Sequence, residues 1–333
     1  MKKIIIICLT LMAPICLFAL KNEPGYLAAR RFGAQTSIRI CVKDDLGSIV
    51  QGAAVSVFMG MNFRTDGYYV RGETDENGVF IAEGKTCGDE IEIKVSKEGY
   101  YSSKKTLCFI KKGLEHDVVE GKWQPFCNEE RMILRQVGAP ESLIVVDKIV
   151  DVVQTNMWMG FDMKKVDFVG PNGRGVYADF EVKAEWDGLP AWESRHCGAT
   201  IRFHQEMCGG YNAARVMESE FPYPFRAETT NGFENKSIAV VERNPDLEGA
   251  HIQFGGDASF VFRTRCIEDN DGTLKSANYG CIRRFEVGPS RRGVVLMRLS
   301  YVFNPTPNDT NLEDEEIANR SRQFIRRCEP LRQ

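Results

Sequence analysis

A stretch of short alternating strands, residues 38–101, constrains the fold of this chain more than any other feature. Its clearest segment, residues 90–95, reads EIEIKV, so that Ile91, Ile93 and Val95 alternate with charged residues. Such alternation places apolar side chains on one face of a strand and polar side chains on the other. Turns rich in Asp and Gly, DDLG and TDENG, separate the strands. The pattern predicts a small β-sandwich.

Four further segments of the same part of the chain show this alternation and are predicted to be strands. They are residues 38–43, 55–59, 79–81 and 106–109. A strand with Met132 and Leu134 facing inward is expected to close the domain.

The turns and strands together resemble a known family. The segments VKDDLGSIVQGAAVSV, GETDENGVF and VSKEGYYSS are similar to the carboxypeptidase regulatory-like domain, a transthyretin-like (prealbumin-like) β-sandwich. The matching positions are Gly47, Gly52, Ala53, Val55, Thr74, Asp75, Asn77, Gly78, Phe80, Lys97, Glu98, Gly99 and Tyr100. The resemblance covers about a quarter of the chain. It implies a non-catalytic module, often attached to secreted enzymes, adhesins or outer-membrane proteins, and it brings no catalytic residue to this sequence.

Residues 1–20 have the composition of an export signal. Lys2 and Lys3 precede an apolar run, and Leu17 and Ala19 fit the positions before a cleavage site. The alternative is a membrane anchor, but the run is shorter than the about 20 residues that a bilayer requires. We therefore expect cleavage, a bacterial protein that is secreted, periplasmic or at the cell surface, and no membrane span in the mature chain.

Breaks in the pattern divide the rest of the chain into two domains, and 333 residues are enough for two cores. Residues 21–34 show no period and are predicted to be a linker, and residues 35–137 form the first sandwich. The Gly-Ala-Pro sequence at 138–140 marks the boundary. Residues 138–333 are predicted to form a second β-sandwich or jelly-roll-like domain with a C-terminal helix over residues 312–327.

Strand patterns at regular spacing fill the second domain, which makes the expected fold class all-β. The longest alternation covers residues 176–186, with Val176 and Trp186 at the two ends of its apolar set. Residues 143–153 are rich in β-branched residues and favour strands, although their period alone leaves a helix open. The remaining predicted strands are residues 199–203, 237–241, 252–254, 260–266, 281–287 and 295–303.

The cysteine count suggests disulfides. The sequence has eleven cysteines, and Cys8 and Cys16 lie in the export signal, which leaves an odd number and at least one unpaired thiol. Simple burial of free cysteines is the alternative. Cys266 continues the apolar phase of Phe260 and Phe262, and Cys281 also faces inward in the next strand, so we expect these two cysteines to pair across the loop between them.

Two other cysteine pairs are candidates. Cys41 and Cys108 both lie on the outward faces of their strands and would pair if those strands were neighbours. Cys197 with Cys208 is the third candidate, and Cys328 is left over.

Three motifs resemble ligand-binding sites, but each has a simpler explanation. His196, Cys197, His204 and Cys208 fall within thirteen residues, yet they lack the spacing of a zinc site. Asp75–Gly78 resembles half a calcium loop, and a turn explains the same residues. The glycine-rich residues 170–175 lie between strand patterns rather than before a helix, so they are expected to form a hairpin turn and not a phosphate cradle. We predict no metal and no cofactor.

The charge and motif content argue against several functions. A formal net charge of −3 provides no basic surplus for nucleic acid. No G-x-S-x-G motif is present. Asp179, Glu181 and Glu185 share one strand face and could supply a carboxylate pair for glycoside hydrolysis, although a solvated face explains them equally well.

Aromatic residues in the second domain suggest a binding surface. Trp192, Tyr211 and Tyr223 are candidates for stacking on sugar rings, and Trp192 and Tyr223 are favoured because Pro and Gly flank them. Packing over a sandwich edge is the alternative. The sequence therefore predicts a secreted, non-catalytic binding or surface-structural protein whose partner is an extracellular glycan or a cell-envelope component. The alternative is a glycan-acting hydrolase with its carboxylates in the second domain.

Overall fold

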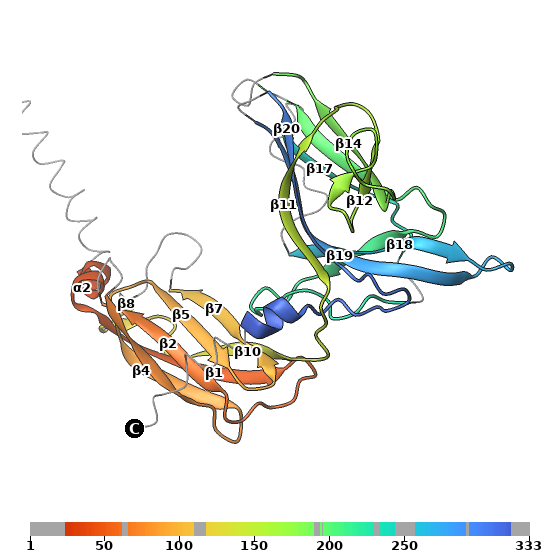
Figure 1. Cartoon of the computed structure of the whole chain (residues 1–333). Helices are drawn as coiled ribbons and strands as arrows, with labels where there is room; N and C mark the ends of the chain where they lie inside the picture. Colours follow the sequence, from red (N-terminus) through yellow and green to blue (C-terminus); the bar gives the residue numbers. More distant parts are fainter. Residues whose placement is uncertain are drawn as a thin grey trace, which may run out of the picture. The chain divides into compact units, whose positions relative to one another are not determined.

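The computed structural model describes residues 24–61, 66–109, 118–189, 194, 196–229, 233–243, 257–290 and 293–320. Strands make up most of these residues, so the prediction of an all-β protein with several sheets and a short C-terminal helix is confirmed (Figure 1). The chain forms two compact units. The first extends to Gln136 and includes Glu218–Glu220, and the second comprises Val137–Met217 and Phe221–Arg320. Within the described residues, no helix is long and apolar enough to cross a membrane.

A helix, α2 (Pro24–Phe32), occupies most of the segment that the sequence analysis assigned to a linker. Pro24 suits the first helical position, and Gly33, with φ +77°, ends the helix. Ala29 is buried, and the ring of Tyr26 meets that of Trp123 edge to face at 6.1 Å. The helix was missed because so short a segment offers too few apolar residues to show a period.

The first unit consists of two sheets that enclose one core. The larger sheet contains β1 (Ala34–Asp44), β4 (Val79–Thr86), β6 (Tyr100–Tyr101), β8 (Val118–Val119), β9 (Lys122–Trp123) and β10 (Asn128–Gln136). Its order is β6-β10-β1-β9-β8, and β4 also pairs with β1. The smaller sheet contains β2 (Ala54–Gly60), β3 (Gly67–Glu73), β5 (Glu90–Ser96) and β7 (Ser103–Cys108), in the order β3-β2-β5-β7.

The alternation in the sequence identifies the core of this unit correctly. The side chains that the pattern placed inward are buried, and both sheets contribute to one cluster. Its members include Ile38, Ile40, Val42, Val55, Val57, Met59, Ile91, Ile93, Val95, Met132 and Leu134. The closing strand β10 runs parallel to β1, with Ile38 opposite Asn128 and Asp44 opposite Leu134.

The turn at Asp75 needs no ligand to explain it. Its Oδ1 accepts hydrogen bonds from the backbone N–H groups of Asn77 at 2.9 Å and Val79 at 2.8 Å. Gly78 adopts φ +71°, which the tight turn requires. These contacts account for the Asp-x-Asn-Gly sequence as a turn.

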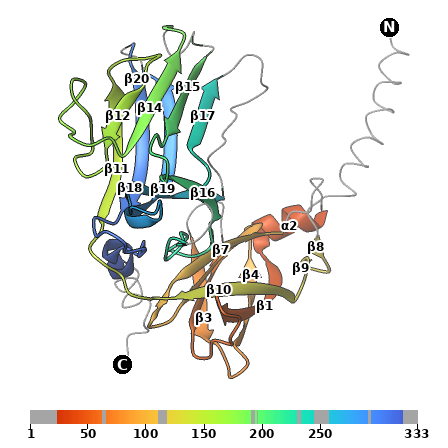
Figure 2. The same ribbon diagram turned by 90° about the vertical axis from the view of Figure 1, so that its right-hand side faces the viewer.

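The second unit is also built from two sheets. One contains β11 (Ile144–Val152), β16 (Gly209–Ala214), β18 (Ala258–Glu268), β19 (Leu274–Pro289) and β20 (Val295–Phe303), in the order β11-β20-β19-β18-β16. The other contains β12 (Met159–Asp162), β13 (Asp167–Phe168), β14 (Phe180–Trp186), β15 (Cys197–Arg202) and β17 (Ser237–Arg243), in the order β13-β12-β14-β15-β17. Figure 2 shows β14, β15 and β17 side by side, with β19 and β20 behind them.

Aromatic side chains from both sheets form the core of the second unit. Phe161 and Phe180 stack at 5.3 Å between ring centroids, and Phe203 stacks on Phe260 at 6.0 Å and Phe262 at 5.7 Å. Since Phe161 and Phe180 belong to one sheet and Phe260 and Phe262 to the other, the core joins the two layers.

One strand prediction of the second unit differs from the structure. The alternation over 176–186 is a strand only from Phe180 onward, and Val176 is 79% exposed, because Asp162 holds the backbone of Val176 and Tyr177 outside the sheet. The β-branched run 143–153 is a strand, β11. The predicted strand 252–254 lies outside the described residues.

The C-terminal helix begins later than predicted. Residues 315–320 are helical, and Asp314 caps them, because its Oδ1 accepts a hydrogen bond from the backbone N–H of Ile317 at 3.0 Å. Residues 321–327 of the predicted helix lie outside the described residues.

The beginning and the end of the second unit are tied together. The carboxylate of Glu313 accepts hydrogen bonds from the backbone N–H groups of Gly138 at 2.9 Å and Ala139 at 2.8 Å. The side-chain amide of Asn311 donates to the carbonyl oxygen of Ala139 at 2.6 Å. The backbones of Glu141 and Asp314 pair as an isolated parallel β-bridge. Glu313 therefore closes this junction with its side chain.

Candidate functional site

A bulge in β18 organises a buried polar cluster of the second unit. Strands β18 and β19 pair regularly from Phe260 to Thr264, after which the next residue of β18 in register is Ile267. Arg265 and Cys266 therefore stand together opposite a single residue of β19, and Arg265 adopts φ 54°. A bulge of this kind turns side chains out of the regular alternation.

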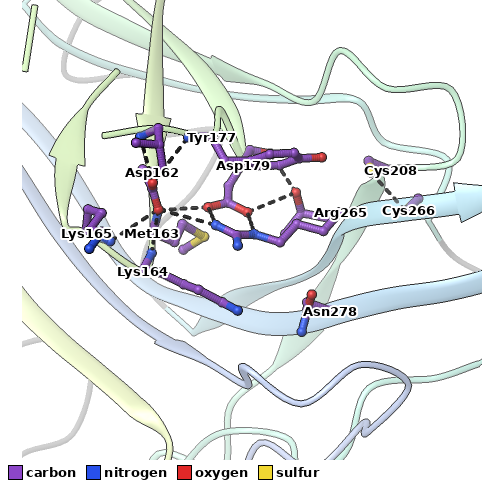
Figure 3. A network of polar contacts seen from close by, with 12 residues as sticks. Asp162, Met163, Lys164, Lys165, Tyr177, Asp179, Cys208, Arg265, Cys266 and Asn278 are labelled. Carbon is purple, nitrogen blue, oxygen red and sulfur yellow. Dashed lines mark hydrogen bonds and ion pairs between the residues drawn. The ribbon is translucent and has the colours of Figure 1, made fainter. Parts of the chain in front are cut away.

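The guanidinium group of Arg265 joins two buried carboxylates (Figure 3). Its Nε lies 2.7 Å from Asp179 Oδ1, and its Nη2 lies 2.9 Å from Asp179 Oδ2 and 3.3 Å from Asp162 Oδ1. The side chains of Asp162 and Asp179 are 1% and 0% exposed, whereas that of Arg265 is 20% exposed. Paired contacts between a guanidinium and a carboxylate are among the strongest hydrogen bonds in proteins.

Each carboxylate oxygen of the cluster accepts a hydrogen bond. Asp162 receives the backbone N–H groups of four residues, Lys164, Lys165, Val176 and Tyr177. Asp179 receives the backbone N–H of Met163 at 2.8 Å and the hydroxyl of Thr264 at 3.4 Å. The two carboxylates are therefore fully occupied with holding backbone and side chains.

Aromatic rings enclose the guanidinium group. The Arg265 Cζ lies 4.7 Å from the centroid of the Tyr177 ring and 5.6 Å from that of Phe303. The hydroxyl of Tyr301 donates to the carbonyl oxygen of Met163 at 2.6 Å. Because Arg265 and Tyr301 belong to one sheet and Asp162 to the other, these contacts fasten the two sheets to each other.

The electrostatics of the cluster keep it charged. Burial alone would raise the pKa of Asp162, but the backbone N–H groups of Val176, Lys165 and Tyr177 and the charge of Arg265 outweigh it and hold that pKa below its usual range. The hydrogen bond to Asp179 raises the pKa of Arg265. Burial raises the pKa of Tyr301, so this hydroxyl keeps its proton and remains a donor.

The carboxylates that the sequence analysis grouped are separated by the structure. Asp179 lies just before β14 and belongs to the buried cluster. Glu181 accepts a hydrogen bond from Arg202 Nε at 2.6 Å, and Glu185 pairs with Lys183 at 2.5 Å. The partner of Asp179 is Asp162, which sequence reasoning missed, because its neighbours Phe161 and Met163 make it look like an ordinary outward residue of a strand.

The predicted cysteine pairs are not at bonding distance, and all the cysteines of the described residues are free thiols. Cys281 is buried opposite Val261 and Val302, whereas the bulge carries Cys266 away from it, to 2.8 Å from the Sγ of Cys208. Cys266 would face Cys281 only in an uninterrupted strand, and the register shift after Thr264 removes it from that phase.

The other two candidate pairs are separated as well. Cys41 lies in β1 and Cys108 in β7, and these strands belong to different sheets. Cys197 is buried in β15 opposite Trp186, while Cys208 has Cys266 as its neighbour. Cys328 lies outside the described residues.

The candidate sugar-binding aromatics each have packing partners. The hydroxyl of Tyr211 accepts the backbone N–H of Glu228 at 3.0 Å, and its ring meets Phe233 edge to face. The ring of Tyr223 lies 4.3 Å from the Cζ of Arg283 and 5.4 Å from that of Arg215. Trp192 lies outside the described residues.

The remaining ligand motifs have structural explanations in the part of the chain that is described. No three His, Cys, Asp or Glu side chains of these residues are grouped to hold a metal ion. The glycine-rich segment 170–175 folds back on itself, with Val169 and Gly175 paired as a bridge. A Cβ at Gly173 would lie 2.3 Å from the carbonyl oxygen of Phe168, so close backbone approach explains this glycine.

Comparisons with known proteins add little. No protein-family model matches the chain, and no curated protein matches it. The 3-chlorocatechol 1,2-dioxygenase of Rhodococcus opacus 1CP is 16% identical, with a TM-score of 0.24 over 32% of this chain and 62% of its own, so the chain spans less than two thirds of that enzyme. The dioxygenase domain of a dioxygenase–carbohydrate-binding fusion from Streptomyces sp. SirexAA-E is 14% identical. Its TM-score is 0.24 over 33% of this chain and 83% of its own.

A third similar structure covers more of the chain. BcpA, the major pilin subunit of Bacillus cereus, is 12% identical with a TM-score of 0.21 over 85% of this chain and 96% of its own. TM-scores as low as these carry no argument about fold or function. The resemblance of the first unit to the carboxypeptidase regulatory-like domain therefore stays a prediction.

Proposed function

We propose that the protein is exported from a bacterial cell and acts as a non-catalytic binding or surface-structural protein. The observation that carries the proposal is that the two carboxylates brought together in the second unit serve as structural hydrogen-bond acceptors. Asp162 and Asp179 are buried around Arg265, and their oxygens accept hydrogen bonds from Arg265 that join one sheet to the other. A pair used in this way holds a sandwich closed.

The same pair is unsuited to glycoside hydrolysis. A glycosidase requires one carboxyl group that keeps its proton near neutral pH and a second carboxylate that can reach a sugar or a water molecule. The pKa of Asp162 is instead lowered, and both side chains are sealed from solvent. These properties favour the non-catalytic function over the glycan-acting hydrolase.

The partner is proposed to be an extracellular glycan or another cell-envelope component, with Tyr223 as its contact. The ring of Tyr223 is only partly buried, and the partly exposed Arg215 lies beside it with its Cζ 5.4 Å from the ring centroid, whereas Arg283 on the other contact is buried and pairs with Asp314. The resemblance of the first unit to a module found in secreted proteins and adhesins is consistent with such a partner.

The function is tested with the mature full-length chain and a panel of cell-envelope polysaccharides. We expect retention of the protein on at least one glycan without release of reducing ends. Tyr223→Ala should weaken the retention, whereas Tyr223→Phe, which keeps the ring, should preserve it. Release of reducing ends that is lost in Asp179→Asn, with the variant still folded, would establish the hydrolase instead.

Export is tested separately. Expression of the complete chain in a bacterium should yield a periplasmic or secreted product whose N-terminus is Leu20 or Lys21. A cytoplasmic product that still begins at Met1 would contradict export.

A further inference from the structure

We propose that Cys208 and Cys266 form a disulfide bond with each other once the folded chain meets a thiol oxidant. The two Sγ atoms lie 2.8 Å apart, closer than non-bonded sulfur atoms approach and not far beyond the about 2.05 Å of a disulfide. The pairing rests on this geometry, and only its occurrence in the cell depends on the proposed export.

The fold brings both cysteines to this position by independent means. Cys208 immediately precedes β16, whose first residue, Gly209, pairs with Arg263 of β18. Cys266 lies three residues beyond Arg263 and is turned toward Cys208 by the bulge at Arg265 (Figure 3). A bond between them would therefore continue the β16–β18 ladder past its last backbone pair without any rearrangement of the strands.

Positive charge gathers around Cys208. The Nζ of Lys236 donates to the carbonyl oxygens of Cys208 and Glu206, and the Nε of Arg263 donates to that of Met207 at 2.6 Å. The hydrogen bond between Cys208 and Cys266, followed by the charges of Lys236 and Arg263, lowers the pKa of the Cys208 thiol. The thiolate is the form that attacks a disulfide.

The difference in solvent exposure indicates which cysteine meets the external oxidant first. Cys266 is partly exposed, whereas Cys208 is buried. An external disulfide, such as oxidised glutathione or the disulfide of an oxidising thiol–disulfide enzyme, first exchanges with Cys266 to give a mixed disulfide and one reduced thiol. The hydrogen bond with Cys208 raises the pKa of Cys266, so this first exchange is the slower of the two steps. The Cys208 thiolate then attacks the Sγ of Cys266, which forms the protein disulfide and releases the second thiol. Two protein thiols are oxidised, one external disulfide is reduced, and the two thiol protons leave with the products.

Each relevant cysteine lies in its own tryptic peptide, so the pairing can be read directly. Cys208 lies in Phe203–Arg215, Cys266 in Cys266–Lys275, Cys281 in Ser276–Arg283 and Cys197 in His196–Arg202. The mature full-length protein is treated with oxidised glutathione, unfolded in guanidinium without reductant, alkylated with N-ethylmaleimide and digested. Mass spectrometry should find Phe203–Arg215 linked to Cys266–Lys275. A link from Cys266 to Cys281, or alkylation of both Cys208 and Cys266, would overturn the proposal.

Stability provides a second, independent measurement. The bond would close a long loop, so reduction should lower the Tm of the oxidised protein by on the order of 10 °C. Cys266→Ser should abolish the dependence of Tm on reductant, and the matched control Cys281→Ala should keep it. An equal dependence in wild type and Cys266→Ser would contradict the pairing. Because the oxidant is added in vitro, failure of the bond is distinguishable from failure of export.

Discussion

Strands β5 and β18 have similar sequence patterns but use them differently. In β5 of the first unit, Ile91, Ile93 and Val95 remain on one face throughout, and all three are buried. In β18 of the second unit, the alternation is followed only as far as Thr264, and the bulge then gives Arg265 and Cys266 new directions. A periodic pattern therefore identifies a strand reliably, but it assigns the face of each residue only while the register is unbroken.

The acidic residues of the two units show the same contrast. Asp75 in the first unit bonds to backbone groups two and four residues further along the chain. Asp179 in the second unit bonds to Arg265, which is 86 residues away. Local hydrogen bonds leave a signature in the sequence, such as Asp-x-Asn-Gly, whereas contacts across two sheets leave none.

The largest expected loss of stability comes from removing the buried charge of Arg265 in the second unit. Arg265→Met would leave two carboxylates buried without their counter-ion and should lower the free energy of unfolding by about 3–5 kcal/mol. The measurement is urea unfolding followed by tryptophan fluorescence in a Trp123→Phe background, because Trp158 and Trp186 lie in the second unit.

The control for this variant is an exposed ion pair of the same unit. Arg298 contacts Asp147 at 3.3 Å, and both side chains are more than a third exposed. Arg298→Met should lower the free energy of unfolding far less than Arg265→Met does, because solvent screens this exposed pair. Equal losses of stability in the two variants would mean that the buried cluster contributes no more to stability than an exposed ion pair.

A cavity in the regular strand should have the next largest effect. Ile93 is fully buried in the core of the first unit, so Ile93→Ala should reduce the free energy of unfolding by about 2–4 kcal/mol. The fluorescence of Trp123 reports on this unit. An unchanged midpoint would show that Ile93 does not face the core.

The pH dependence of the second unit follows from Asp162. Its pKa in the folded protein is lowered from 3.8, so the unfolded chain binds the proton more readily and the stabilisation is fully present above that value. It should be lost as the pH falls below 3.8 through the lower, folded pKa. Urea unfolding at pH 7, 5 and 3 should show a fall between the last two conditions that is smaller in Asp162→Asn. An identical fall in both proteins would assign the acid sensitivity to other groups.

The smallest predicted effect concerns the local turn. Asp75→Ala removes two hydrogen bonds from a turn at the surface and should cost about 1 kcal/mol. Asp45→Ala, at an exposed position of another turn, serves as the control and should be close to neutral. A cost above that of Ile93→Ala would contradict the view that Asp75 acts only locally.

The sequence was sufficient for the fold class, for the core of the first unit and for most strands of the second. These depend on apolar periodicity, which strands such as β5 and β20 display openly. The helix α2 was missed because nine residues offer too short a period. The late start of β14 could not be predicted, because it depends on Asp162 holding Val176 and Tyr177 from another part of the chain.

The sequence identified some residues of the candidate site but not which residues they contact. Asp179 and both cysteines of the close pair, Cys208 and Cys266, were singled out, but each was given the wrong neighbour. The partners depend on the bulge at Arg265, where a non-glycine residue takes a positive φ. Nothing in the sequence TRCIE marks that conformation, so the pairing required the three-dimensional structure.

The junction around Glu313 has a consequence for how the second unit could be rearranged. Since its carboxylate holds Gly138 and Ala139, the unit begins and ends at one place. A module with adjacent ends can be inserted into a surface loop of a host protein, or given new termini in a loop of its own, without pulling its sheets apart. Loss of the Glu313 carboxylate would leave the sandwich itself intact and weaken this junction, which the hydrogen bond from Asn311 to Ala139 and the backbone pairing of Glu141 with Asp314 would still hold.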